Sequence, residues 1–193
     1  VNNDGFQDIF VSGYDLDHLR DVAKDYSSEI QNIITTTEKP RLYINNGDET
    51  FTESAKQYGI SKSLYAMGAN FGDIDNDGFL DFYVGTGAPD FSTIIPNRMF
   101  KNIQGKRFEE ITSAGNFGHI QKGHGIAFAD IDRDGDQDIY SVMGGAYQGD
   151  TFTNILYENP ISKNNWIVIE LLGTLMNTSA IGAVIEVKLN NRK

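Results

Sequence analysis

Three features are scarce in this chain of 193 residues, and each scarcity narrows what the protein can do. It contains no cysteine, which excludes disulfide bonds and metal sites built from thiolates. No apolar run approaches the roughly 18 residues needed to cross a bilayer, which argues against membrane insertion. Its 16 basic residues are outnumbered by 27 acidic ones, and the resulting net charge of −11 disfavours nucleic acid and anionic membranes as partners.

The residues that are present describe an ordinary globular protein rich in strands. Hydrophobic residues make up 39% of the chain and charged residues 22%, which is enough apolar material for a core. The chain has 20 glycines, 12 phenylalanines and 9 tyrosines, and this composition favours strands and tight turns over helical bundles. We therefore expect an all-β fold.

One stretch is unusually acidic. Asp73, Asp75, Asp77 and Asp81 fall within nine residues, with Gly78 among them and an apolar run behind. Two such charges at a separation of roughly 5 Å repel by about 3 kcal/mol at an effective dielectric constant of 20. A hard divalent cation with oxygen ligands, above all calcium, would relieve this repulsion. The alternative is a turn rich in Asp, Asn and Gly that merely joins two strands.

The acidic stretch recurs, which favours the cation. We call Asp73–Asp81 loop two; Asp130–Asp138 repeats it as loop three, and Asn2–Asp8 matches its later part as loop one. The sequence starts one residue short of the first ligand of loop one, as expected of a fragment. The central aspartates are 73 and 57 residues apart, so the chain is a tandem array whose longer first interval accommodates an insertion.

The repeated loops predict two full calcium sites and one partial site. In loops two and three the carboxylates are expected to converge on one ion, and Gly78 and Gly135 permit the sharp turn that aims a backbone carbonyl inward. Loop one lacks its leading ligand, so its site should be weak or empty. The expected ligands are Asp73, Asp75, Asp77, the Phe79 carbonyl and Asp81; Asp130, Asp132, Asp134, the Gln137 carbonyl and Asp138; and Asn2, Asp4, the Gln7 carbonyl and Asp8.

These loops are not EF-hands. We count Asp73 and Asp130 as position one of loops two and three. An EF-hand requires a glutamate at position twelve, where these loops have Val84 and Ser141. The flanking segments also have the pattern of strands. Strands are expected before the loops at 65–71 and 123–129, directly after each loop, and in hairpins at 41–53 and 97–112.

One segment departs from the β pattern. Between Leu16 and Ile33, apolar residues recur at spacings of three and four, which predicts a helical insertion near residues 15–34. We expect its apolar face to rest on the edge of a sheet. A helix that binds a partner is the alternative.

At this point the residues resemble a known family. Phe71-Gly72, loop two and the turn at residues 85–89 look like an FG-GAP repeat of the integrin α-subunit type, and the hairpin at residues 42–51 is similar to the bacterial VCBS repeat. The resemblance implies a β-propeller, usually of seven four-stranded blades, with calcium in the loops. Here it implies an incomplete propeller of about three blades, approximately residues 1–64, 65–122 and 123–165.

The last segment has a different pattern. Strands are expected at residues 165–174 and 182–189, and no acidic loop follows them. Residues 166–193 resemble the start of an ASPIC/UnbV domain, which follows FG-GAP arrays in secreted proteins. Alternatively, these strands close the last blade.

The function expected from these observations is a non-catalytic, calcium-binding scaffold for interaction or adhesion, in the extracellular space or on the cell surface. Its ligand would be an unknown protein or carbohydrate, and an open array of blades is expected to self-associate through its exposed faces. The alternatives are the propeller portion of a secreted polysaccharide-degrading enzyme and a purely structural spacer. No catalytic motif supports the enzyme. His119 and His124 fit a solvated loop better than a metal or substrate site, and Glu109 and Glu110 should point to opposite faces of a strand.

Overall fold

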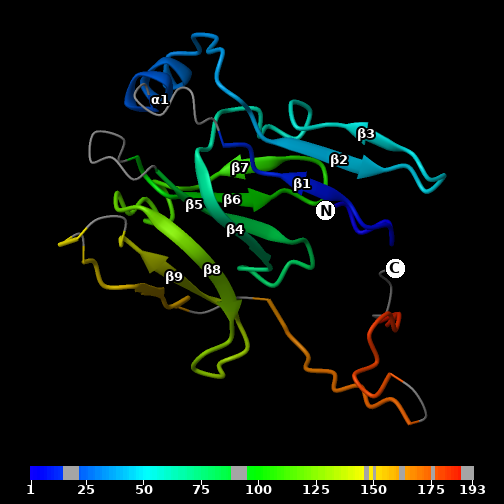
Figure 1. Ribbon diagram of the computed structural model, residues 1–193. Helices are drawn as coiled ribbons and strands as arrows, with labels where there is room; N and C mark the ends of the chain where they lie inside the picture. Colours follow the sequence, from blue (N-terminus) through cyan, green and yellow to red (C-terminus); the bar gives the residue numbers. More distant parts are fainter. Residues whose placement is uncertain are drawn as a thin grey trace.

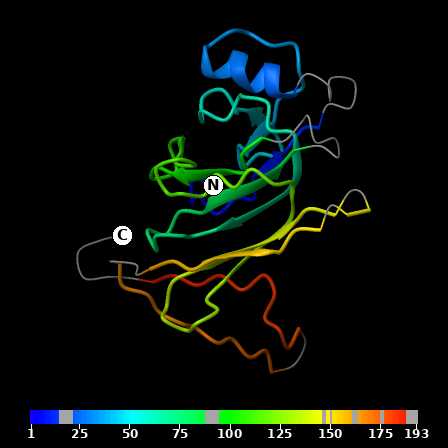
Figure 2. The ribbon, with the colours of Figure 1, turned by 90° about the vertical axis from the view of Figure 1, so that its left-hand side faces the viewer.

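The computed structural model of the protein describes residues 1–14, 22–87, 95–145, 148–149, 151–160, 164–174 and 177–187. It is nearly all β, with three antiparallel sheets and one α-helix. The sheets are stacked in chain order (Figures 1 and 2), which confirms the expected all-β, incomplete propeller. Within these ranges no helix has the length and hydrophobicity needed to cross a membrane.

Each sheet is a meander in which every strand pairs with the next one along the chain. The first sheet contains β1 (Ile9–Val11), β2 (Arg41–Asn45) and β3 (Phe51–Glu53). The second contains β4 (Ala66–Gly72), β5 (Asp81–Thr86), β6 (Arg98–Asn102) and β7 (Phe108–Glu110). The third contains β8 (Gly123–Ala129), β9 (Asp138–Met143) and β10 (Ile155–Tyr157). The predicted hairpins and the strands that flank the loops are thus confirmed, and β1, β5 and β9 each follow an acidic loop.

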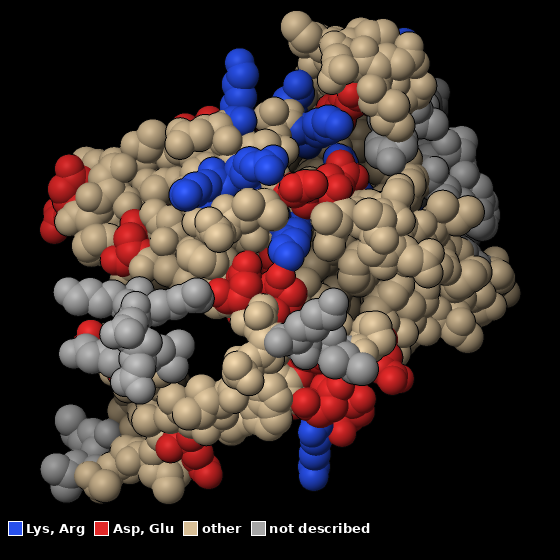
Figure 3. All heavy atoms as spheres, turned by 180° about the vertical axis from the view of Figure 1, so that it is seen from behind, with Lys and Arg blue, Asp and Glu red and all other residues tan. Residues whose placement is uncertain are grey.

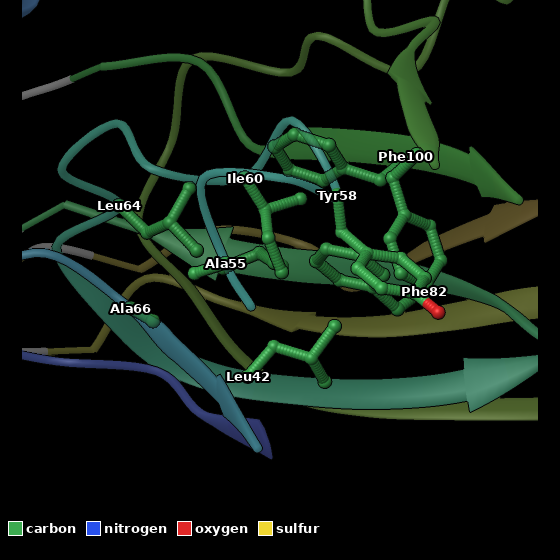
Figure 4. Packing of buried hydrophobic residues seen from close by; sticks show 10 residues of the cluster. Leu42, Ala55, Tyr58, Ile60, Leu64, Ala66, Phe82 and Phe100 are labelled. Carbon is green, nitrogen blue, oxygen red and sulfur yellow. The ribbon is translucent and has the colours of Figure 1, made fainter. Parts of the chain in front are cut away.

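The side chains of β5 point alternately toward the first and the third sheet, so this strand packs against both. Phe82 and Val84 are fully buried and belong to a cluster that includes Leu42 of the first sheet, as Figure 4 shows for part of this cluster. The ring of Phe82 stacks on that of Phe100 with centroids 4.6 Å apart. Tyr83, between these residues, points the other way and packs with Ile139 of the third sheet. The second sheet is therefore buried on both faces.

Glycine lets the second and third sheets approach closely. A Cβ atom on Gly68 of β4 would lie 1.7 Å from the carbonyl oxygen of His124 in β8, so no side chain fits there. The strands β4 and β8 consequently run side by side (Figure 1).

The helix ends before the predicted limit of residue 34, and the side chains of Val22, Ala23 and Tyr26 on its predicted apolar face lie outside the described part. It spans α1 (Val22–Ile30); residues 15–21 lie outside the described residues, and 31–34 are not helical. The predicted apolar face is wrong for Ile30 and Ile33, which are 61% and 55% exposed. Two carboxylates of α1 hydrogen-bond the segment before β4, because the Tyr65 hydroxyl donates to Asp25 and the Ser63 amide donates to Glu29.

The two strands predicted at the end of the chain are not formed in its described part, and residues 188–189 of the second lie outside that part. The described residues 164–174 and 177–187 contain no strand. Ile167, Val168 and Val184 are 70%, 76% and 94% exposed, so the alternating apolar residues have no sheet to pack against. The third sheet accordingly has three strands, where the second has four.

Candidate functional site

The three acidic loops share one backbone conformation. The glycine at position six has a φ of 90°, 91° and 98° at Gly5, Gly78 and Gly135. The residue at position four also has a positive φ, at Asn3, Asn76 and Arg133. A positive φ strains any residue with a Cβ, and glycine avoids this cost. The sequence pattern therefore encodes the same turn three times.

The aspartate at position one organises the loop that follows it. Asp73 accepts hydrogen bonds from the amides of Asp77 and Gly78, at 3.0 and 2.9 Å. Asp130 accepts the equivalent bonds from Asp134 and Gly135, both at 3.1 Å. These bonds curl each loop around its own first carboxylate.

The aspartate at position nine fastens the loop to the sheet. In loop two, one oxygen of Asp81 accepts the amide of Asn102 at 2.7 Å, and the other accepts the amide of Ile74 at 2.9 Å. Asp138 makes the same pair of bonds to Asn159 and Ile131. Asp8 accepts the amide of Asn45 and the amino group of Val1. This aspartate therefore has a structural role in all three loops, besides any role as a ligand.

Asn45 and Asn102, which end β2 and β6, and Asn159, which lies two residues after β10, have a role that sequence reasoning missed. The side-chain amide of Asn102 donates to Leu80 O in loop two, which leads into its own sheet, and to Val1 O in loop one, at 3.2 and 2.9 Å. Asn159 likewise donates to Gln137 O and, in loop two, to Ile74 O. The available signal was that each of these asparagines stands three residues after an apolar residue, at Leu42, Met99 and Leu156, in all three repeats. These amides tie each loop to the next sheet.

The asparagines at position four of loops one and two join neighbouring loops directly. The side chain of Asn3 in loop one donates to Gly78 O of loop two at 2.6 Å. The side chain of Asn76 in loop two donates to Gly135 O of loop three at 3.0 Å. The loops thus form one row along the stacked sheets.

Two of the loops gather carboxylates closely enough to share an ion. Carboxylate oxygens of Asp73, Asp75 and Asp81 lie within 4.8 Å of one another in loop two. The same is true of Asp130, Asp132 and Asp134 in loop three. Asp77 bonds the Phe79 amide, and Asp138 lies outside the close group of loop three. An all-oxygen, anionic set of this kind matches the ligands that calcium prefers.

The electrostatics of loop two favour a bound cation. Asp81 has no exposed surface, and burial raises its pKa to about 7, aided by the charges of Asp75 and Asp73, although two backbone hydrogen bonds oppose the rise. Burial likewise raises the pKa of Asp73. A cation in the cluster would stabilise the ionised carboxylates and reverse these shifts. Loop two already has one positive neighbour, because the Lys101 ammonium forms an ion pair with Asp75.

Two of the expected carbonyl ligands occupy a different place in the loop. Gln7 and Gln137 stand one residue before the last aspartate, as Leu80 does, and each of these three carbonyls accepts the amide of its sheet's asparagine. The counterparts of Phe79 are Phe6 and Asp136. In loop one, Asn2 hydrogen-bonds Asp4, and Asp4 accepts the Phe6 amide. We therefore expect the backbone carbonyls of Phe6 and Asp136, in place of those of Gln7 and Gln137, to be the carbonyl ligands of loops one and three.

Comparison with known proteins bears on this repeat. Residues 1–84 match the family model of the FG-GAP-like repeat. The match supports an FG-GAP repeat in this part of the chain, which covers loops one and two, and with it a β-propeller type of architecture. A search of curated proteins found no match to the chain. The resemblance to VCBS repeats and to an ASPIC/UnbV domain stays a prediction.

The remaining candidate residues lie apart from the acidic loops. Among the described residues, neither close aspartate group includes His119 or His124. The ring of His119 packs against Phe152, and its Nδ1 accepts the Gln121 amide. Acidic side chains form several separate clusters on the face shown in Figure 3, with Lys and Arg among them.

Proposed function

We propose that this chain is a calcium-binding β-propeller segment that serves as a non-catalytic interaction scaffold outside the cell. The observation that carries the proposal is the construction of the same loop at Asp73–Asp81 and Asp130–Asp138, each with three carboxylates within 4.8 Å of one another. A turn that only joined two strands would not need to repeat this unfavourable concentration of charge. The FG-GAP match over residues 1–84 supports the same reading.

Calcium would act here by neutralising charge between strands. In loop two, Asp73, Asp75 and Asp81 would hold it, and in loop three Asp130, Asp132 and Asp134 would do so. Loop two is hydrogen-bonded to the third sheet through Asn159 and to loop three through Asn76, so ions in these two loops would stiffen the junction between the second and third sheets. Calcium sites of extracellular modules typically bind at about 10⁻⁴–10⁻³ M, a range that is filled outside the cell and not in cytosol. This favours an extracellular or cell-surface location.

The two loops should differ in affinity. Lys101 pairs with Asp75 in loop two, and the residue at the same place before the asparagine of the third sheet is Glu158. Calcium must displace or outcompete an ammonium group in loop two, whereas loop three has no such neighbour in the equivalent position. We therefore expect loop three to bind calcium more tightly than loop two.

A calcium titration by isothermal calorimetry tests the proposal. We expect two ions per chain, and one ion each for the matched variants Asp75→Asn and Asp132→Asn, which remove the position-three carboxylate of loop two or loop three. Asn keeps the shape of the side chain but loses its charge. Absence of binding heat in the wild-type protein, with near-ultraviolet circular dichroism showing it folded, would refute the calcium proposal.

The single tryptophan gives loop three a signal of its own. A Cβ on Gly135 would overlap the Trp166 ring, so this indole lies directly on loop three. Terbium luminescence excited through tryptophan should therefore report on loop three and decline as calcium is added. Asp132→Asn should abolish the signal and Asp75→Asn should leave most of it; the opposite pattern would contradict the assignment.

A further inference from the structure

The position-six glycine of loop three is covered by an aromatic ring, and its two counterparts are not. A Cβ atom built on Gly135 would lie 1.8 Å from Cε2 of Trp166, so the indole lies directly against this backbone. The same atom built on Gly5 or Gly78 would meet nothing within 4 Å. All three glycines have nearly the same φ, between 90° and 98°. The turn itself therefore does not bring a cover with it, and the cover is particular to loop three.

The chain just before Trp166 is also held on the acidic loops. We call residues 159–160 and 164–166 the strap. The side chain of Asn159 donates to Ile74 O in loop two at 2.6 Å, and that of Asn164 donates to Asp75 O in the same loop at 2.7 Å. In Figure 1 the chain, drawn in orange, leaves the third sheet beside the end of β8, where loop three begins. The strap thus contacts both loops that gather three carboxylates.

The backbone that the indole covers is the turn on which the carboxylate cluster of loop three depends. The Gly135 amide donates to Asp130 at 3.1 Å, and its carbonyl accepts the side chain of Asn76 at 3.0 Å. The residue before it, Asp134, belongs to the close carboxylate group. The indole lies against this same glycine. Docking of Trp166 and closure of the carboxylates therefore require the same conformation of the loop.

From this shared turn we propose that Trp166 is a lid on loop three, and that calcium in this loop and the docked indole stabilise each other. The inference rests on the calcium sites proposed above. Without an ion, repulsion among Asp130, Asp132 and Asp134 opposes the compact turn on which the indole rests. With an ion, the turn is fixed, and the ring keeps water from one side of the site and so strengthens the attraction between ion and carboxylates. By linkage, calcium tightens docking by the same factor by which docking tightens calcium binding.

The lid also places the residues that follow it. Ile167 and Val168 come directly after Trp166 and are 70% and 76% exposed. They are held beside loop three when the indole is docked and are released with it. Calcium thereby controls where this exposed apolar segment lies.

Acrylamide quenching of the single tryptophan tests whether calcium drives docking. In the wild-type chain, saturating calcium should lower the quenching constant at least twofold relative to chelator. Gly135→Ala places a methyl group where the indole lies, so its quenching constant should stay high in both buffers. Gly5→Ala is the matched control, because its φ is equally positive but its Cβ meets nothing within 4 Å, and it should behave as the wild type does. Far-ultraviolet circular dichroism checks that each variant is folded.

The reciprocal effect is measured on calcium binding by calorimetry. In the Asp75→Asn background, where loop three is the remaining full site, adding Trp166→Ala should raise the dissociation constant at least threefold. Trp166→Phe keeps an aromatic ring and should restore most of the affinity. In the Asp132→Asn background, where loop two remains, Trp166→Ala should change the affinity much less, because the ring covers loop three alone.

The outcomes separate the lid from the calcium sites. Calcium binding with normal heats, but with unchanged quenching of the wild type or unchanged affinity of Trp166→Ala, would overturn the lid and leave the sites standing. Quenching in calcium that is equal for the wild type and Gly135→Ala would overturn the docked indole itself. Absence of any binding heat would refute the calcium sites and, with them, the coupling.

Discussion

Replacing Glu110 with alanine is expected to lower the free energy of unfolding by about 3 kcal/mol, in the range found when one partner of a buried ion pair is removed. Arg98 is only 1% exposed, and its guanidinium donates to both oxygens of Glu110, at 3.1 and 2.8 Å. A third bond goes to Ser63 O. Without Glu110, the buried charge of Arg98 would lose its counter-ion. Guanidinium-induced unfolding at neutral pH measures the loss.

The neighbouring glutamate provides a matched control. Glu109 pairs with Arg107 at 3.5 Å, and both side chains are more than half exposed. Exposed pairs contribute about 0–1 kcal/mol, so Glu109→Ala should be nearly neutral. Burial would raise the pKa of Glu110, but hydrogen bonds from Arg98 and Thr112 and the charge of Arg98 outweigh it and hold this pKa below its usual value. Equal destabilisation by the two substitutions would contradict the assigned pair.

Removing calcium should produce the other large effect. An ion that binds only the folded state adds about 1.4 kcal/mol at a free concentration ten times its dissociation constant. Two sites together would add about 3 kcal/mol, which corresponds to a rise in melting temperature of roughly 6–11 °C for a domain of this size. We expect this difference between calorimetric melts in calcium and in EDTA.

The double variant Asp75→Asn/Asp132→Asn supplies the control for this melt. It lacks one central carboxylate in each cluster, so its melting temperature should hardly respond to calcium. Magnesium should replace calcium poorly in the wild type, because it requires a tighter octahedral set of ligands and gives up its water reluctantly. A wild-type melting curve that is the same in calcium and in EDTA would contradict the prediction.

The β architecture could be predicted because it rests on local patterns. Glycine at position six of each loop and the apolar runs behind the loops each specify a local conformation, and the structure has both. In the structure, the alternation of side chains within β5 places Phe82 and Tyr83 on opposite faces, as the local geometry of any strand requires. Repetition of these signals then made the stacking of similar sheets predictable.

The predictions that were wrong, and the features that the sequence did not reveal, concern contacts between segments distant in the chain. Apolar spacing predicted the helix, but Asp25 and Glu29 attach it through Tyr65 and Ser63, which lie 40 and 34 residues away in the sequence. Alternation after Trp166 shows only which residues could share a face, and no strand forms in the described residues 166–174 and 177–187. The asparagine bonds between sheets were missed for the same reason, since their acceptors are backbone carbonyls of another repeat.

The proposed calcium sites can be tested most directly by anomalous X-ray diffraction from crystals grown with calcium. We expect one anomalous peak among Asp73, Asp75 and Asp81 and another among Asp130, Asp132 and Asp134, each about 2.3–2.6 Å from the carboxylate oxygens. Loop one, which offers Asn2, Asp4 and Asp8, should show a weak peak or none. Water at both carboxylate clusters in saturating calcium would contradict the claim that these loops are calcium sites.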